Sequence, residues 1–209
     1  MGRRADAQVR GVSGASWVLL RHGESTANRA GIYSGWHDVP LTEVGRAQAS
    51  AAGRALQGRR FARVLSSDLQ RATETARLAL VAAGLPHLPI VRMPGLRERS
   101  LGEWQGQSRE ALREAHPERP LLRWSGAAPG GETLGTLAHR VLRTLADTDD
   151  NEGPTLLVAH GGVIRVLLGL LDGTPTSALW TRRVANAVPI DAHAPRGTWA
   201  RLLAGLPAA

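Results

Sequence analysis

Cysteine and lysine are both missing from this chain of 209 residues. Without cysteine, disulfides, zinc–thiolate sites and thiol nucleophiles are excluded. All 26 residues counted as lysine or arginine are arginine; they are spread along the chain, and only one Phe and one Tyr are present for base stacking. The formal charge of +8 therefore fits surface charge or an anionic small-molecule substrate, and we expect no nucleic-acid partner.

Long apolar runs are missing too. No stretch reaches the length that spans a membrane, and Met1-Gly2-Arg3-Arg4 leads into polar residues rather than the apolar core of a signal peptide. We therefore expect a cytoplasmic protein with no membrane partner. The length and a hydrophobic content of 43% predict a single domain, over residues 15–209. Residues 1–14 carry no hydrophobic period and are predicted to form a flexible tail.

Strand and helix patterns alternate along the chain without an internal repeat, which predicts an α/β fold. The predicted strands cover residues 17–20, 63–66, 89–93, 155–159, 183–190 and 199–203. The predicted helices cover about residues 42–56, 67–80, 133–146 and 163–171. Prolines and paired glycines between about residues 104 and 131 predict a cap segment with one short helix.

Two helix starts can be predicted in more detail. Thr42 is expected to cap the first helix, whose apolar face is predicted to contain Val44, Ala47, Ala51 and Ala55. The second is predicted to start at a capping box formed by Ser67 and Gln70. Its apolar stripe is predicted to contain Leu69, Ala72, Ala76 and Leu80. Arg71 then lies in a first helical turn, where an anion is favoured; a solvated arginine is the alternative interpretation.

Two histidines follow predicted strands directly. His22 lies between Arg21 and Gly23 after the first strand, and His160 follows the strand over residues 155–159. Open α/β sheets carry out their chemistry at the carboxyl ends of their strands. The two histidines are therefore expected to share one site.

The residues next to these histidines limit the chemical roles that the histidines can have. Arg21 would repel a metal ion beside His22, and neither histidine has a partner at ligand spacing, so no metal site is expected. No glycine–serine–glycine elbow follows a strand, which disfavours a serine nucleophile. The remaining role is histidine as the nucleophile, and nearby arginines favour its neutral form.

Six motifs follow one another in the order of a known family. They are Arg21-His22-Gly23-Glu24 with Thr26 and Asn28; Ser34-Gly35-Trp36 with Pro40-Leu41-Thr42 and Gly45; Ser66-Ser67-Asp68-Leu69 with Arg71, Ala72 and Thr75; Glu98 with Leu101-Gly102-Glu103-Trp104; Gly131-Glu132; and His160-Gly161-Gly162. With this combination the chain resembles the phosphoglycerate mutase-like group of the histidine phosphatase superfamily, over about residues 17–203. The resemblance implies a three-layer α/β/α sandwich with a mostly parallel central sheet, and no bound cofactor.

The resemblance also implies catalytic roles. His22 would attack phosphorus and become a phosphohistidine, and Glu98 would protonate the departing oxygen and then take a proton from water. Glu103, in the same loop, is the alternative proton donor. The phosphoryl oxygens would be held by Arg21, Arg71 and His160.

Substrate binding is expected from Asn28, Ser34, Gly35 and Gly161. Asn28 would donate a hydrogen bond to the phosphoryl group, and backbone N–H groups around the two glycines would add more. The alternative interpretation of Asn28 is a helix or turn cap.

The resemblance leaves three functions open. Hydrolysis of small phosphorylated metabolites, of the sugar phosphate or phosphoglycerate type, is favoured because Ser100-Leu101 stands where mutases carry a histidine and an aromatic. The chain also lacks their lysine and is short where they carry an insertion. The alternatives are a cofactor-dependent phosphoglycerate mutase and an inactive phospho-ligand-binding module. The expected partner is a small-molecule phosphate ester, and a homodimer is left open.

Overall fold

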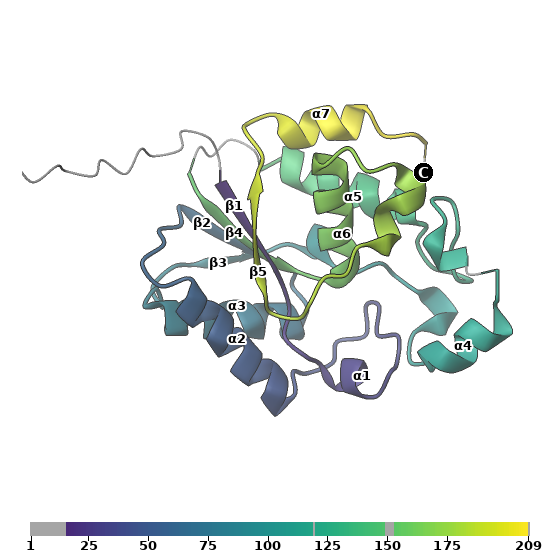
Figure 1. The fold of residues 1–209 in the computed structure, drawn as a ribbon, viewed down its shortest axis with the longest axis horizontal. Coiled ribbons are helices and arrows are strands. Elements are labelled where there is room, and N and C mark those ends of the chain that lie inside the picture. Colours follow the sequence, from purple (N-terminus) through teal and green to yellow (C-terminus); the bar gives the residue numbers. More distant parts are fainter. Residues whose placement is uncertain (1–15, 119, 149–152, 209) are drawn as a thin grey trace, which may run out of the picture.

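Five strands form one sheet in the order β3-β2-β4-β1-β5 (Figure 1). The computed structural model describes residues 16–118, 120–148 and 153–208, so the tail predicted over residues 1–14 lies outside the described residues. The strands are β1 (Ser16–Arg21), β2 (Arg63–Ser66), β3 (Ile90–Arg92), β4 (Thr155–Ala159) and β5 (Pro189–His193). Four of them are parallel, and β5 pairs antiparallel with β1. The mostly parallel sheet is as predicted.

Helices cover both faces of the sheet, as expected for a three-layer α/β/α sandwich (Figure 1). The α-helices are α1 (Thr26–Arg29), α2 (Glu43–Ala55), α3 (Gln70–Ala83), α4 (Arg109–Ala115), α5 (Leu134–Ala146), α6 (Gly161–Leu171) and α7 (Thr198–Ala204). Helices α2 and α3 pack with Val18 and Leu20 of β1, whereas α5, α6 and α7 pack with Trp17 and Leu19. This alternation follows from the two-residue period of a strand.

Strand β4 lies at the centre of the sheet and all five of its residues are buried. Its apolar run predicts this, because a parallel strand covered on both faces needs apolar side chains on both. Arg21 at the end of β1 pairs in register with Ala159 at the end of β4. The residues that follow, His22 and His160, are thereby brought to the same edge.

The predicted apolar face of α2 is wrong. Thr42 caps the helix through Gly45 N, as expected, but Val44 is 49% exposed, and Ala47, Ala51 and Ala55 are exposed as well. The buried residues of α2 are Gly45, Ala49, Ala52 and Gly53. Gly53 explains the difference, because a Cβ there would lie 2.2 Å from the Ala79 carbonyl oxygen of α3. The two helices pack closely through their smallest residues. Hydrophobicity alone does not predict this, because residue size decides which face can approach α3.

The predicted start of α3 is also wrong. Its N-cap is Leu69, without a side-chain cap, and the Gln70 backbone N donates to Asp38 Oδ1 at 2.8 Å. Ser67 lies two residues before this N-cap, and its Oγ is 2.8 Å from His160 Nε2. The apolar stripe behind this start is confirmed, since all four of its predicted members are buried.

Two strand predictions near the carboxyl end need correction. Residues 199–203 belong to helix α7, where Trp199 is buried against Trp17 with ring centroids 5.1 Å apart. Leu202 and Leu203 continue this contact at helical spacing. The strand predicted over residues 183–190 starts only at Pro189, because the preceding segment turns toward the edge where β1 ends, with Ala187 at φ 49°.

Within the described ranges, four short 3-10 helices join these elements: η1 (Pro94–Leu96), η2 (Gly102–Trp104), η3 (Pro120–Leu122) and η4 (Thr176–Thr181). Around η2, α4 and η3 a small third apolar cluster forms, apart from the two that flank the sheet. It contains Leu101, Trp104, Leu112, Leu121 and Ala128, with Tyr33 packed against it. This separate cluster is compatible with the predicted cap segment. The cap segment itself stays a prediction. Within the described residues, no helix has both the length and the apolarity needed to cross a membrane.

Candidate active site

The two strand-end histidines are neighbours. The ring centroids of His22 and His160 lie 5.2 Å apart, with an interplanar angle of 60°. The His22 backbone N donates to the Ala159 carbonyl at 2.9 Å, which extends the β1–β4 pairing by one residue. The parallel strands therefore position both rings.

A hydrogen bond selects the tautomer of His22. Its Nδ1 lies 2.7 Å from the Gly23 carbonyl oxygen, which can only accept, so Nδ1 carries the proton. Burial, together with the guanidinium groups of Arg71 and Arg21, lowers the pKa of His22 well below its usual range. The ring is therefore neutral at pH 7, and its Nε2 has a free lone pair.

His160 is equally buried. Its Nε2 lies 2.8 Å from Ser67 Oγ, and its Nδ1 has no hydrogen-bond partner in the described part of the chain. Burial, Arg71 and His22 lower the pKa of His160 well below its usual range. A buried polar atom without a partner is costly, so Nδ1 is suited to contact a ligand.

Arg21 and Arg71 bring two cations to the histidines. Arg21 Nη1 donates to the Val184 carbonyl at 2.7 Å, while Nη1 and Nη2 of Arg71 donate to the carbonyls of His37 and Gly35 at 2.9 and 2.8 Å. In both side chains Nε is buried without a partner among the described residues. Burial lowers the pKa of Arg21 to about 10, so it stays charged at pH 7.

The sequence predicts that the first turn of α3 faces an anion, but the helix that begins at the site is α6. The first backbone N–H of α3 is occupied by Asp38, so it is not available to a substrate. The helix that begins beside the histidines is α6, with His160 as its N-cap and Gly161 on the cavity wall. Its dipole favours an anion there.

Glu98 lies in this site, and Glu103 does not line it. The Glu98 carboxylate accepts hydrogen bonds from the backbone N of Gly162 at 3.0 Å and of Arg99 at 2.9 Å. Glu103 is exposed on η2. Of the two carboxylates, Glu98 is the one placed to reach a ligand at His22.

An ion pair holds the loop that carries Glu98. Glu132 and Arg140 form two hydrogen bonds of 2.7 Å, and Arg140 also donates to the carbonyls of Arg97 and Glu98 at 3.0 and 3.2 Å. The Ser100 backbone N donates to Glu132 at 2.8 Å. Sequence reasoning found Glu132 in a motif but assigned it no role.

A cavity of about 260 Å³ lies at these groups, and His160, which is fully buried behind His22, is not among the residues that line it. Of the residues expected from sequence, its walls include Arg21, His22, Asn28, Ser34, Gly35, Arg71, Glu98 and Gly161. Asn28 also completes the capping box of α1, whose N-cap is Ser25: the Ser25 backbone N donates to Asn28 Oδ1 and the Asn28 backbone N donates to Ser25 Oγ, both at 3.2 Å. Its Oδ1 is further approached by Asn186 Nδ2 at 3.3 Å, which leaves the Asn28 amide N–H₂ to face an acceptor. The two interpretations of Asn28 are thus compatible.

Several further residues line this cavity that the sequence did not identify individually as site residues. They are Tyr33, Arg99, Leu101, Arg109, Leu121, Arg165 and Trp180. Asn186, which donates to the His22 carbonyl at 2.8 Å, was also missed. In a chain with 26 arginines, three isolated arginines give no signal until the fold brings them together.

The cavity carries a large excess of positive charge. Five arginines line it, and the one carboxylate among its lining residues is that of Glu98. Arg99 is only 1% exposed, and burial lowers its pKa to about 10, so it too stays charged. A phosphoryl dianion would be strongly attracted here. In the described part of the chain, no three His, Asp or Glu side chains are grouped as metal ligands.

Comparisons with known proteins agree with this geometry. A family model described as the histidine phosphatase superfamily (branch 1) matches residues 17–201. A relative from Gloeobacter violaceus, named 2,3-bisphosphoglycerate-dependent phosphoglycerate mutase 2, is 36% identical over 195 residues, 89% of each chain. The solved structure of Bacillus stearothermophilus YhfR has a TM-score of 0.79 at 30% identity, covering 88% of this chain and 93% of that one. Mycobacterial glucosyl-3-phosphoglycerate phosphatase Rv2419c has a TM-score of 0.75 at 30% identity, covering 85% and 89%.

From its short length, this chain is expected to be a phosphatase rather than a mutase. The Gloeobacter relative is named a mutase, yet it and this chain each cover 89% of the other. The shortness of this chain therefore does not separate phosphatases from mutases.

Proposed function

The chain belongs to the histidine phosphatase superfamily, and we propose that it is a phosphomonoesterase that hydrolyses small phosphorylated metabolites through a phosphohistidine at His22. One observation carries this proposal. Nδ1 of His22 is held by the Gly23 carbonyl, so Nε2 presents its lone pair beside Arg21, Arg71 and Glu98. A nucleophile, cations and a proton donor thus share one cavity.

In the first step, His22 Nε2 attacks phosphorus and the bond from phosphorus to the ester oxygen breaks. Glu98 gives its proton to that oxygen, so a neutral alcohol leaves. The bond from Nδ1–H to the Gly23 carbonyl stabilises the positive charge that develops on the phosphorylated ring.

In the second step, a water attacks phosphorus from the side opposite His22. The Glu98 carboxylate takes a proton from this water, the bond from phosphorus to Nε2 breaks, and inorganic phosphate forms. Glu98 is then protonated for the next cycle, and His22 is neutral again.

Arg21, Arg71 and His160 hold the phosphoryl oxygens in both steps. Their buried Nε and Nδ1 atoms without partners are the donors that a phosphoryl group would satisfy. Removing one such preorganised donor typically slows an enzyme by about 10²–10³-fold. Because these side chains supply the positive charge, we propose that the reaction needs no metal ion.

The second candidate is a 2,3-bisphosphoglycerate-dependent mutase, which the name of the Gloeobacter relative favours. A mutase must return the phosphoryl group to bound product before water reaches it. Against it, Ser100-Leu101 stands where the mutase pattern has a histidine and an aromatic. A coupled assay of phosphoglycerates that found mutase flux well above phosphate release would reverse this order.

The proposal is tested with an aryl phosphate in the presence of a chelator. Wild-type protein should turn over and form an acid-labile, alkali-stable phosphoenzyme, and His22→Ala should lose both. His87→Ala is the matched control, because His87 is exposed. Retained turnover in His22→Ala would remove this residue from the mechanism. Failure to trap a phosphoenzyme with a panel of sugar phosphates, phosphoglycerates and nucleotides would favour an inactive binding module.

A further inference from the structure

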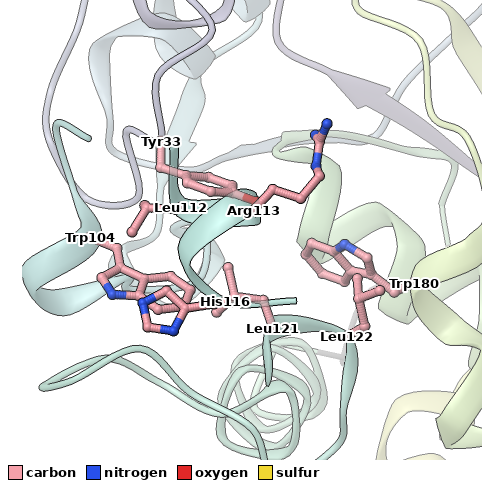
Figure 2. Close-up of a pocket in the computed structure, with 8 residues that line it drawn as sticks. All are labelled: Tyr33, Trp104, Leu112, Arg113, His116, Leu121, Leu122 and Trp180. Carbon is pink, nitrogen blue, oxygen red and sulfur yellow. The ribbon is translucent and has the colours of Figure 1, made fainter. Parts of the chain in front are cut away.

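A second hollow, of about 310 Å³, lies next to the catalytic cavity (Figure 2). Its walls include Tyr33, Trp104, Leu112, Leu121, Leu122 and Trp180. Nothing in the proposed chemistry of His22 uses this hollow. Its lining comes mainly from η2, α4, η3 and η4, elements that lie outside the sheet.

The hollow concentrates side chains that are scarce in this chain. The sequence has six Trp, one Tyr and one Phe, and three of these eight aromatic residues line this one space. Figure 2 shows Trp104 beside His116 on one side of the hollow and Trp180 on the other, with Leu121 between them. Ligand pockets typically have such apolar and aromatic walls with a few polar groups, here Arg113 and His116.

The hollow adjoins the proposed phosphoryl site, because the two spaces share wall residues. Tyr33, Leu121 and Trp180 line both spaces. Trp180 also contacts two cations of the catalytic cavity, with the Arg99 and Arg165 guanidinium carbons 5.0 and 4.7 Å from its ring centroid. A molecule whose phosphate lies at His22 can therefore place its remaining part against Trp180.

We propose that this hollow binds the leaving alcohol of the substrate, and that this alcohol carries a flat apolar ring. The inference rests on the proposed phosphomonoesterase activity and narrows its substrate class. A ring fits because aromatic walls favour stacking or edge contacts with another ring. It is favoured over a purely polar alcohol because leucine and tryptophan surfaces gain little from a hydroxyl group.

The test compares naphthylmethyl phosphate with methyl phosphate. Their leaving alcohols have similar acidity, so a difference in kcat/KM reports binding of the ring rather than leaving-group chemistry. We expect kcat/KM to be at least about tenfold higher for the naphthylmethyl ester, since each 1.4 kcal/mol of extra binding gives a factor of ten. Naphthylmethanol alone should bind wild-type protein by calorimetry and inhibit competitively.

Leu122→Glu places a carboxylate on the wall of the hollow at a residue that is 37% exposed. It should lower the naphthylmethyl-to-methyl ratio about tenfold and weaken naphthylmethanol binding. Val81→Glu, at a 54% exposed residue of α3, introduces the same carboxylate away from both cavities and should leave the ratio as in wild type. Thermal unfolding checks that both variants are folded. If Leu122→Glu does not fold, naphthylmethanol binding to wild type decides.

Each outcome separates the two proposals. Equal kcat/KM for the two esters, with phosphoenzyme still formed, overturns the assignment of the hollow and leaves the phosphomonoesterase intact. Hydrolysis of neither ester, together with no turnover of the aryl phosphate, overturns the phosphomonoesterase and, with it, the leaving-group site. Hydrolysis of the aryl phosphate but of neither alkyl ester overturns the leaving-group site alone. Dimerisation that Leu122→Glu abolishes, without any ester preference, overturns the assignment in favour of an interface between two copies.

Discussion

Gly162→Ala should disable the proposed proton donor without removing it. A Cβ at this position would lie 2.2 Å from Glu98 Oε1 and 3.2 Å from its carboxyl carbon. Since a carbon and an oxygen in contact stay more than 3 Å apart, the carboxylate must move by about 1 Å. Such a displacement typically costs about 10²-fold in rate, within the 10²–10⁴-fold that general acid catalysis supplies. The barrier should rise by about 2.7 kcal/mol.

Two esters separate the two roles of Glu98. An alkyl phosphate needs a proton on its leaving oxygen, so its phosphoenzyme should form about 10²-fold more slowly in Gly162→Ala. An aryl phosphate such as p-nitrophenyl phosphate needs little protonation, so it should give a rapid burst of nitrophenol followed by slow turnover, because water still lacks its base. Quench-flow with trapped phosphoenzyme measures both phases.

Gly205→Ala is the matched control, since the nearest atoms to its Cβ would lie at 3.6 Å. Both variants should unfold at similar temperatures. Wild-type rates for both esters in folded Gly162→Ala would refute the placement of Glu98 as acid and base.

Two further predictions concern pH and loop positioning. The pKa values of His22 and His160 are lowered in the folded state by burial and nearby arginines, so below about pH 6.5 the unfolded chain takes up protons that the folded chain does not. The free energy of unfolding should therefore fall as pH drops from about 6.5, by at most about 1.4 kcal/mol per pH unit for each histidine. Urea unfolding at several pH values measures this, and His160→Gln should flatten the slope; an unchanged slope would contradict it. Glu132→Gln weakens the ion pair with Arg140 that holds the Glu98 loop, so kcat should fall about tenfold with KM little changed. Unaltered kcat in the folded variant would show that the loop holds its position without this pair.

The position of the two histidines could be predicted because parallel strands end at the same edge of a sheet. The apolar runs over residues 17–20 and 155–159 predict buried strands, and these strands are adjacent in the structure. The residue after each strand is thereby placed by topology alone, whatever the loops do.

Hydrophobicity along the sequence could not predict which face of α2 is buried, nor that residues 199–203 form a helix rather than a strand. Gly53 is buried because α3 approaches closely, and Trp199 is buried in a helix because Trp17 lies opposite. In each case the partner, far along the chain, overrides local propensity.

The local pattern of residues along the sequence thus determined the α/β fold class, the placement of the two histidines at strand ends, and the identity of the motif loop that carries Glu98. Only tertiary structure decided that Arg99, Arg109 and Arg165 join the two expected arginines around the cavity at His22. It also decided that Trp104, Trp180 and Tyr33 line one hollow beside that cavity. The physical reason is that backbone periodicity is a property of neighbouring residues. Charge and aromatic surface become a site only where distant segments pack together.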